Sequence, residues 1–526
     1  MPYSHGKRDR MTFAENLEKQ LYRKKQVTEN GAVGYKRSGK RLLDLNFAVS
    51  SMRNWSEDKV IKYFAQAYYE DPLLAVKWLF YARDIRGCGM GERRVFRLCM
   101  RYLVKNHWEY VQNVIRLVPE YGRYDDWLCL FGTAAEDQVV ELIREQLRCD
   151  LQMMEQGKQI SLLAKWLPSC NTSSAHSREK AKAICNRLEL SSGEYRRIVS
   201  CLRKYLNVVE VKMTADEWNS IEYDKVPSRA NLLYRNAFLR NDELRRRRFL
   251  DQLKHGETKI NAHTLFPSDI VAKYYESGIS YRWSTYGLKE KDDTLEALWN
   301  ELPDYVKEDG TTLVVRDGSG SMRTFVGNTK VTALNVATAL TIYFAEHCQG
   351  QYQNRFITFS SEPQMIDLSN ASSLREKLEI CEMYQDCSNT DIKAVFDLIL
   401  STALEGKLSQ EELPKNILIV SDMEFDHAID GYGFRNTGLQ ALFEQISAKY
   451  VKYGYRMPRL IFWNICSRTN TVPLRENELG VALVSGYSPA VYRMVLSNEL
   501  DPYQCLVKEL NSERYQAVED ALQRAV

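Results

Sequence analysis

Apolar side chains recur at helical spacing through the first 310 residues of the chain. In residues 56–69 they fall three and four positions apart behind Ser56, a residue type that favours the start of a helix. Residues 73–82 are apolar almost throughout, which indicates a buried helix that begins at Pro72. Similar segments follow, joined by short polar connectors. We therefore predict an α-helical, HEAT-like array with irregular repeats, and leave open whether it closes into a ring.

After residue 310 the pattern changes to strands alternating with helices. Short apolar runs at 311–315, 355–360 and 416–422 predict buried strands, and the amphipathic segments between them predict helices. This alternation is typical of a mostly parallel, doubly wound α/β sheet, in which ligands bind at the carboxyl ends of the strands. We thus divide the chain into a helical module, 1–306, and an α/β domain, 307–526.

The composition places the chain among soluble globular proteins. Hydrophobic residues make up 44% and charged residues 27% of its 526 positions. No segment offers about 18 consecutive apolar residues, and the N-terminus has no apolar core like that of a signal peptide, so we expect a cytoplasmic protein without a membrane partner. Twelve cysteines without a C-x-x-C pair indicate neither a zinc knuckle nor a disulfide framework.

Charge is distributed unevenly along the chain. Residues 311–526 carry 20 Lys and Arg against 26 Asp and Glu, whereas residues 1–310 carry 52 against 43. Residues 1–310 therefore have a net charge of +9 and residues 311–526 one of −6. A basic module of this kind is compatible with binding to nucleic acid.

Hydroxyls and carboxylates gather at the predicted ligand edge of the sheet. The stretch "VVRDGSGSM" follows the first strand and places Asp317, Ser319 and Ser321 at every second position. Thr390, just before a helix, and Asp422, just after a strand, come from two other loops at that edge. These oxygen donors suit Mg²⁺, or Mn²⁺ or Ca²⁺, and disfavour zinc.

This set of residues resembles the metal-ion-dependent adhesion site of the von Willebrand factor A domain. That pattern is Asp-x-Ser-x-Ser, then a distant Thr, then a distant Asp, and this sequence matches it at each position. The resemblance implies that the hydroxyls contact the metal and the acids act largely through water. It also implies an open position for an acidic group from a protein partner. The alternative is a domain of this type without a functional metal site, and Arg316 beside the motif favours that alternative.

The order of the two parts resembles the Ro autoantigen, or TROVE-type, family. A poorly characterised group of Ro-like proteins is similar over most of the chain, in blocks such as "YARDIRGCGMGERRVFR", "VPEYGRYDDWLCLF", "AKWLPS" and "SDMEFD". The resemblance implies a ring of helical repeats that binds small structured or misfolded RNA, with single-stranded ends in the hole. It further implies a ribonucleoprotein scaffold without catalytic activity.

The resemblance directs attention to basic residues near helix starts in the helical module, where phosphates bind readily. Two alternatives stay open, because arginines in this region can pair with nearby acids inside the array and Trp166 can be a packed core residue. The candidate RNA-binding residues are Arg83, Arg86, Arg93, Arg94, Lys165, Arg178, Lys180 and Lys182.

Two other functions compete with RNA binding. A metal-dependent adaptor between proteins, with no role for RNA, would need only the adhesion-type site. A metal-dependent hydrolase or nuclease would use Asp317 and Asp422 with the nearby Glu424 and Asp426. The sequence shows no activated nucleophile and no phosphate-cradling loop, so we expect a binding protein and not an enzyme.

Overall fold

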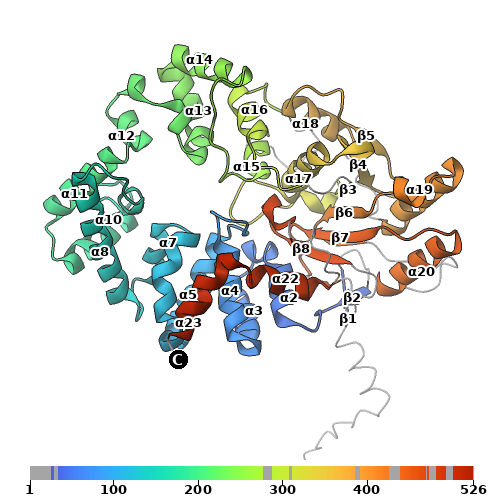
Figure 1. Ribbon diagram of the computed structural model, residues 1–526, viewed down its shortest axis with the longest axis horizontal. Coiled ribbons are helices and arrows are strands. Elements are labelled where there is room, and N and C mark those ends of the chain that lie inside the picture. Colours follow the sequence, from blue (N-terminus) through green and yellow to red (C-terminus); the bar gives the residue numbers. More distant parts are fainter. Residues whose placement is uncertain are drawn as a thin grey trace, which may run out of the picture.

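The computed structural model combines a helical module with an α/β domain (Figure 1). The residues it describes are 25–28, 33–275, 287–306, 311–384, 391–425, 439–469, 471–472, 481–492, 494 and 501–524.

Helices of the first module follow one another with short connectors, as the hydrophobic pattern predicts. The helix expected over 56–69 is α3, Glu57–Glu70, and the next is α4, Pro72–Arg83, whose N-terminus is capped by the Asp71 carboxylate accepting from the Leu74 amide. The others that the structure describes are α2 (Arg41–Ala48), α5 (Arg93–Asn106), α6 (Trp108–Val111), α7 (Val118–Tyr121), α8 (Glu136–Glu155), α9 (Leu163–Trp166), α10 (Ala175–Leu188), α11 (Ser192–Tyr205), α12 (Val209–Thr214), α13 (Ser228–Asn241), α14 (Glu243–Lys254), α15 (Pro267–Val271) and α16 (Asp293–Asn300).

These helices run around a central cavity (Figure 1). The path of helices around the cavity closes where the turn after α4 contacts the segment before α15. In that turn Gly91 has a φ of +72° and lies against the Phe266 ring. A Cβ at this position would stand 2.8 Å from the ring's Cζ. Only glycine combines this backbone conformation with so close an approach.

The α/β domain contains a six-stranded sheet in the order β5-β4-β3-β6-β7-β8. All neighbours are parallel except the edge strand β5, which is antiparallel to β4. This agrees with the predicted mostly parallel sheet. Its strands are β3 (Thr312–Asp317), β4 (Arg355–Phe359), β5 (Met365–Asp367), β6 (Asn416–Ser421), β7 (Arg459–Asn464) and β8 (Ala482–Ser485).

The two faces of the sheet belong to two apolar cores. Alternate side chains, such as Val314 and Val315 on β3, point to opposite faces. The Val314 face packs under α17 (Ala333–His347) and α18 (Leu374–Met383), and its core continues into the helical module. The Val315 face packs under α19 (Ile392–Gly406) and α20 (Leu439–Lys452).

The ends of the described chain cross between the two modules. Near the N-terminus, β1 (Lys25–Val27), β2 (Val33–Tyr35) and α2 lie against the α/β domain, where the Phe47 carbonyl accepts from the Asn464 amide at 2.8 Å. At the other end, α22 (Pro502–Leu510) and α23 (Gln516–Gln523) return to α4 (Figure 1). The modules are therefore interlocked in space, although the helical and α/β patterns separate in the sequence.

Within the described residues, no helix is both long enough and apolar enough to cross a membrane.

Candidate functional site

The helical module surrounds a central cavity of about 2360 Å³. The wall of the cavity is built from the turn between α4 and α5, the end of α9 and the connector after it, the inward faces of α11, α12 and α13, and one loop of the α/β domain, residues 326–329. Pockets for small molecules hold about 300–1,000 Å³, so this cavity is large enough for a segment of a polymer.

The cavity wall is strongly cationic. Eleven of its lining residues are Arg or Lys and three are Asp or Glu, so the ratio of basic to acidic residues is much higher here than in residues 1–310 as a whole, which carry 52 against 43. The acids are Glu92, Glu210 and Asp269; the cations are Arg53, Arg83, Arg86, Arg93, Arg94, Arg123, Lys165, Arg196, Arg197, Arg203 and Arg229.

Five of the eight predicted RNA-binding residues line this cavity: Arg83, Arg86, Arg93, Arg94 and Lys165. The other three lie on α10 and are not among its lining residues. One of them, Arg178, donates to the backbone carbonyls of Thr172 and Ser173 at 2.7 and 2.8 Å, which orders the loop before its own helix. Lys182 is exposed on α10, and Lys180 is partly buried there.

Two of the five lining residues hold the wall together. The guanidinium of Arg83 is buried and pairs with Asp126 at 2.8 Å. The guanidinium of Arg94 donates to the carbonyls of Met52 and Trp55 at 2.8 and 2.9 Å. The alternative to RNA contact was that arginines pair with nearby acids inside the array. Arg83 makes such a pair, with Asp126.

Arg93 differs from these, because it opens onto the cavity at the first residue of α5. It makes no ion pair with any described residue. Burial lowers its pKa, and the positive charges of Arg123 and Arg97 lower it further. An anion bound here would relieve this repulsion between like charges.

An aromatic surface stands beside these cations. The Trp166 ring is partly buried and lines the cavity, and the guanidinium of Arg123 lies over it, 3.8 Å from the ring centre. Stacked arginine and tryptophan offer a flat surface of the kind on which nucleic-acid bases stack.

Sequence reasoning missed six of the cavity's cations. The alternation of apolar and polar residues in α11 shows that Arg196 and Arg197 leave the core, since Tyr195, Val199 and Leu202 fill it. It does not show that the polar face of this helix borders a cavity, because that depends on how the array closes. The missed residues are Arg53, Arg123, Arg196, Arg197, Arg203 and Arg229.

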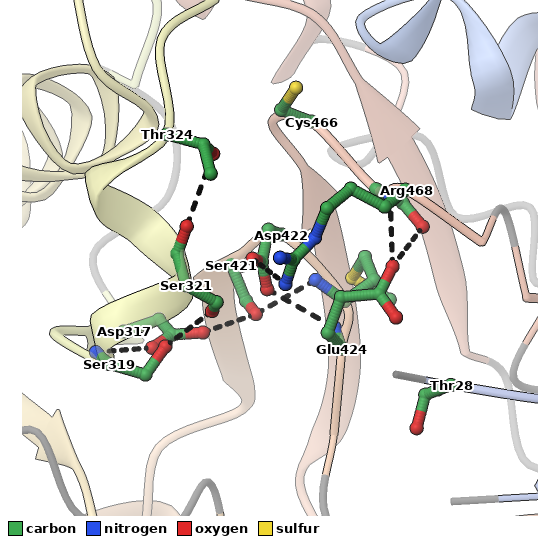
Figure 2. A network of polar contacts seen from close by, with 12 residues as sticks. Thr28, Asp317, Ser319, Ser321, Thr324, Ser421, Asp422, Glu424, Cys466 and Arg468 are labelled. Atoms are coloured by element: carbon green, nitrogen blue, oxygen red, sulfur yellow. Dashed lines mark hydrogen bonds and ion pairs between the residues drawn. The ribbon is translucent and has the colours of Figure 1, made fainter. Parts of the chain in front are cut away.

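A second site lies where β3 and β6 end (Figure 2). The buried Asp317 carboxylate accepts from the Ser319 amide at 2.9 Å with one oxygen and from the Ser421 hydroxyl at 2.5 Å with the other. The Ser319 and Ser321 hydroxyl oxygens are 2.9 Å apart. The structure therefore brings together the three residues of the Asp-x-Ser-x-Ser motif.

Asp422 completes this oxygen cluster from the end of β6. Burial, and then the charge of Asp317, raise its pKa to about 7, while hydrogen bonding to Ser321 and the charge of Arg468 oppose the rise. The Arg468 guanidinium approaches the Asp422 carboxylate to 3.3 Å. Four of the five predicted metal ligands thus converge, and the fifth, Thr390, lies outside the described residues.

Arg468 is held in place by Glu424. One carboxylate oxygen of the buried Glu424 accepts from the Ser467 hydroxyl at 3.0 Å and from the amides of Arg468 and Thr469 at 2.8 and 2.9 Å. Glu424 therefore anchors the loop after β7 (Figure 2), and Asp426 lies outside the described residues.

Arg316 points away from the oxygen cluster. Its guanidinium donates to the carbonyls of Cys381 and Tyr384 at 3.0 and 2.9 Å, on the face of the sheet that α17 and α18 cover. Adjacent residues on a strand face opposite sides, so Arg316 and Asp317 do not share a site.

The donor chemistry of the cluster fits a hard divalent cation. Two carboxylates and two hydroxyls supply oxygen ligands of the type that Mg²⁺ takes in proteins. Among the described residues, no three His, Cys, Asp or Glu side chains are grouped around one point.

Comparisons with known proteins cover both modules. Residues 28–138 and 192–312 match a domain of unknown function, DUF2828, and residues 311–523 match a second, DUF7788. The chain is also similar to the uncharacterized protein L728 of Acanthamoeba polyphaga mimivirus, with 28% identity over 92% of this chain and 86% of that protein. The two domain matches meet where the helices give way to β3, and the viral relative spans both.

Proposed function

We propose that the protein is a non-catalytic RNA-binding scaffold that holds a single-stranded segment of a small structured or misfolded RNA in its central cavity. The observation that carries this proposal is the lining of that cavity, eleven basic residues against three acidic ones. Four of the basic residues already pair with carboxylates, namely Arg53, Arg83, Arg123 and Arg229. Phosphate groups are the natural counter-charges for the others in this confined space.

The dimensions and the aromatic surface favour RNA over a small anion. A volume of about 2360 Å³ exceeds what a single nucleotide or metabolite fills. The Arg123–Trp166 stack supports base contacts, and Arg93, repelled by neighbouring cations, supports a phosphate contact. We extend the proposal to the family: a Ro-like ring of HEAT-like repeats joined to a von Willebrand factor A-type domain, supported by the order of the modules and the oxygen cluster on β3 and β6.

Charge reversal inside and outside the cavity tests the RNA proposal. Arg93→Glu or Arg197→Glu places a negative charge in the wall, so we expect the Kd for a labelled single-stranded RNA to rise about tenfold or more at fixed salt. The matched control is Lys182→Glu, the same charge change at an exposed position of α10 that does not line the cavity. Fluorescence anisotropy at several salt concentrations gives the Kd and its salt dependence.

Equal losses in all three variants would show that RNA binds through the overall charge and would contradict the cavity as the site. No salt-dependent binding by the wild-type protein would overturn RNA binding altogether. Thermal unfolding of each variant separates loss of binding from loss of fold.

A second candidate function is favoured by the oxygen cluster. We propose that Asp317, Ser319, Ser321 and Asp422, with Thr390, hold a divalent cation, Mg²⁺ foremost, and that this ion binds an acidic group of a protein partner. The metal would supply a positive charge to which a carboxylate coordinates. A partner that binds there without RNA would make the protein a metal-dependent adaptor.

Binding of the metal alone tests this second proposal. Isothermal titration with Mg²⁺ or Mn²⁺ should show one site in the wild-type protein, and Ser319→Ala should weaken it because a ligand hydroxyl is lost. Thr324→Ala is the control, because the Thr324 hydroxyl donates to the Ser321 carbonyl and is not one of the proposed ligands. This variant should bind the ion as the wild-type protein does. No binding by wild type, or equal affinity in the Ser319 variant, would contradict the proposed ligand set.

A further inference from the structure

Two thiols face each other in the wall of the cavity. Cys170 lies in the connector between α9 and α10, is partly exposed and lines the cavity. Cys185 lies on the buried side of α10. Their sulfur atoms are 3.7 Å apart, although the residues are 15 positions apart in the sequence.

Hydrogen bonds fix the connector on both sides of Cys170. Before it, Arg203 donates to the Leu167 carbonyl at 2.6 Å and to the Ser169 hydroxyl at 2.7 Å, and the Tyr195 hydroxyl donates to the Pro168 carbonyl at 2.8 Å. After it, Arg178 binds two carbonyls of the same connector. The proximity of the thiols is thus built into the fold of this wall and does not depend on one loose side chain.

We propose that Cys170 and Cys185 are a reversible redox site that forms an intramolecular disulfide when the protein meets a peroxide. Closing the gap from 3.7 Å to a bonded S–S distance of about 2.05 Å requires a movement of less than 2 Å, which is within reach of side-chain rotation. The proposal does not depend on what the cavity binds.

The exposure of the two thiols assigns their roles. Cys170 is accessible from the cavity, so its sulfur attacks the peroxide, becomes a sulfenic acid and releases water when hydrogen peroxide is the oxidant. Burial and the neighbouring Cys170 raise the pKa of Cys185 to about 12, so it stays a thiol until the sulfenic acid forms beside it. The Cys185 sulfur then displaces the sulfenic hydroxyl group, which leaves as a second water with the Cys185 proton. Two thiols and one hydrogen peroxide thereby give one disulfide and two waters.

A metal site is the competing explanation for two adjacent thiols. Zinc in a structural site takes four ligands. Within the described parts of the chain, no third His, Cys, Asp or Glu joins this pair to make a metal-binding group. The pair is therefore suited to bonding between its own sulfur atoms.

The bond would join the cavity wall to α10. Ser169, Cys170 and Asn171 all line the cavity, so a disulfide restrains this part of the wall relative to the helix behind it. A cross-link that closes a short loop restricts the unfolded chain and raises the temperature of unfolding. Thiol reductants reverse the bond by exchange.

Peptide mapping tests the proposal on the full-length reduced protein. After treatment with hydrogen peroxide, remaining thiols are alkylated and the protein is digested without reductant. We expect a cross-linked pair of peptides that contain Cys170 and Cys185, lost on dithiothreitol treatment. The exposed Cys149 and Cys201 report how far general oxidation has gone in the same sample.

Matched serine variants complete the experiment. Cys170→Ser and Cys185→Ser should each abolish the cross-link and the oxidation-dependent rise in the unfolding temperature, whereas Cys149→Ser should retain both. Oxidation of Cys149 and Cys201 with Cys170 and Cys185 still alkylated as free thiols would overturn the proposal. So would a sulfinic acid at Cys170 with no cross-link. RNA affinity is measured in a separate experiment, so a protein that binds no RNA can still form the disulfide between Cys170 and Cys185.

Discussion

Buried charges show how single residues adjust to this fold. Arg246 is fully buried, and its guanidinium lies about 5 Å from the ring centres of Tyr223, Phe238 and Phe249. Burial lowers its pKa to about 10, so the group still carries its charge at neutral pH. One of the four arginines in the run 245–248 thus belongs to the core, which composition alone does not reveal.

Asp44 is a buried acid whose charge destabilises the folded state. It is 8% exposed, one of its carboxylate oxygens accepts no hydrogen bond, and burial raises its pKa from 3.8 to about 6. The folded state therefore binds the proton of the Asp44 carboxyl more tightly than the unfolded state does. The stability that this protonation adds to the folded state is lost as pH rises from about 4 to about 6.

Asp44→Asn removes the charge and keeps the oxygen that accepts from the Ser38 amide. We expect the free energy of unfolding at pH 7 to rise by about 1–2 kcal/mol. This is less than the whole rise in the pKa of Asp44 would give, because the new amide N–H groups lack acceptors. At pH 4 the gain should vanish. Thermal unfolding across this pH range measures both effects. The exposed Asp251→Asn is the control, and a gain that does not depend on pH would contradict the assignment to Asp44.

At the scale of elements, the returning C-terminal helices neutralise charges buried in the first helices. Lys77 of α4 is completely buried, and its ammonium group donates to Glu519 on α23 at 2.7 Å and to Asn511 at 2.8 Å. The buried Asp84 accepts from Arg514 at 2.9 Å. These partners stand more than 400 positions apart in sequence, so α23 is part of the helical module's stability.

Glu519→Ala tests this role of α23. The buried ammonium group of Lys77 would lose its carboxylate partner, so we expect the free energy of unfolding to fall by about 3 kcal/mol. This value lies near the lower end of the cost of breaking a buried ion pair, because Glu519 is 23% exposed. Asp520→Ala, on the exposed side of the same helix, should cost much less. Adding Lys77→Met to the Glu519 variant should recover most of the lost stability. If it does not, the unpaired charge of Lys77 is not the cause of the loss.

At the scale of the whole molecule, the helical module and the sheet meet around Arg53 and Asn54. Arg53 pairs with Glu92 at the start of α5, and its guanidinium lies 3.8 Å from the centre of the Tyr487 ring. Asn54 accepts from the Gly327 amide and donates to the Phe325 carbonyl, which fixes the loop that borders the cavity. One wall of the cavity therefore belongs to the α/β domain, and neither module builds the cavity alone.

Features set by local sequence could be predicted. The Asp71 cap, the start of α4 at Pro72 and the convergence of Asp317, Ser319 and Asp422 all follow from neighbours in sequence or from the rule for strand ends. That Arg316 and Asp317 point to opposite faces of the sheet also follows from strand alternation.

Features set by how distant helices are arranged around the cavity could not be predicted. RNA contact by Arg178 stays a prediction, and its basic character alone does not show that it also donates to the loop before its own helix. Arg197 gave no signal of its own, because only the arrangement of α11 across from α5 places it on a cavity. The pairing of Lys77 with α23 depends on the return of the chain's last helices, which no local pattern indicates.

We propose that RNA binds in the cationic cavity. Photo-crosslinking of a single-stranded RNA that contains thiouridine, followed by mass spectrometry of the wild-type protein, locates bound bases directly. We predict crosslinks in the peptides that contain Trp166 and Arg196–Arg197, suppressed by high salt. Crosslinks confined to the outward surface of α10 around Lys182, or to the α/β domain away from residues 326–329, would contradict it.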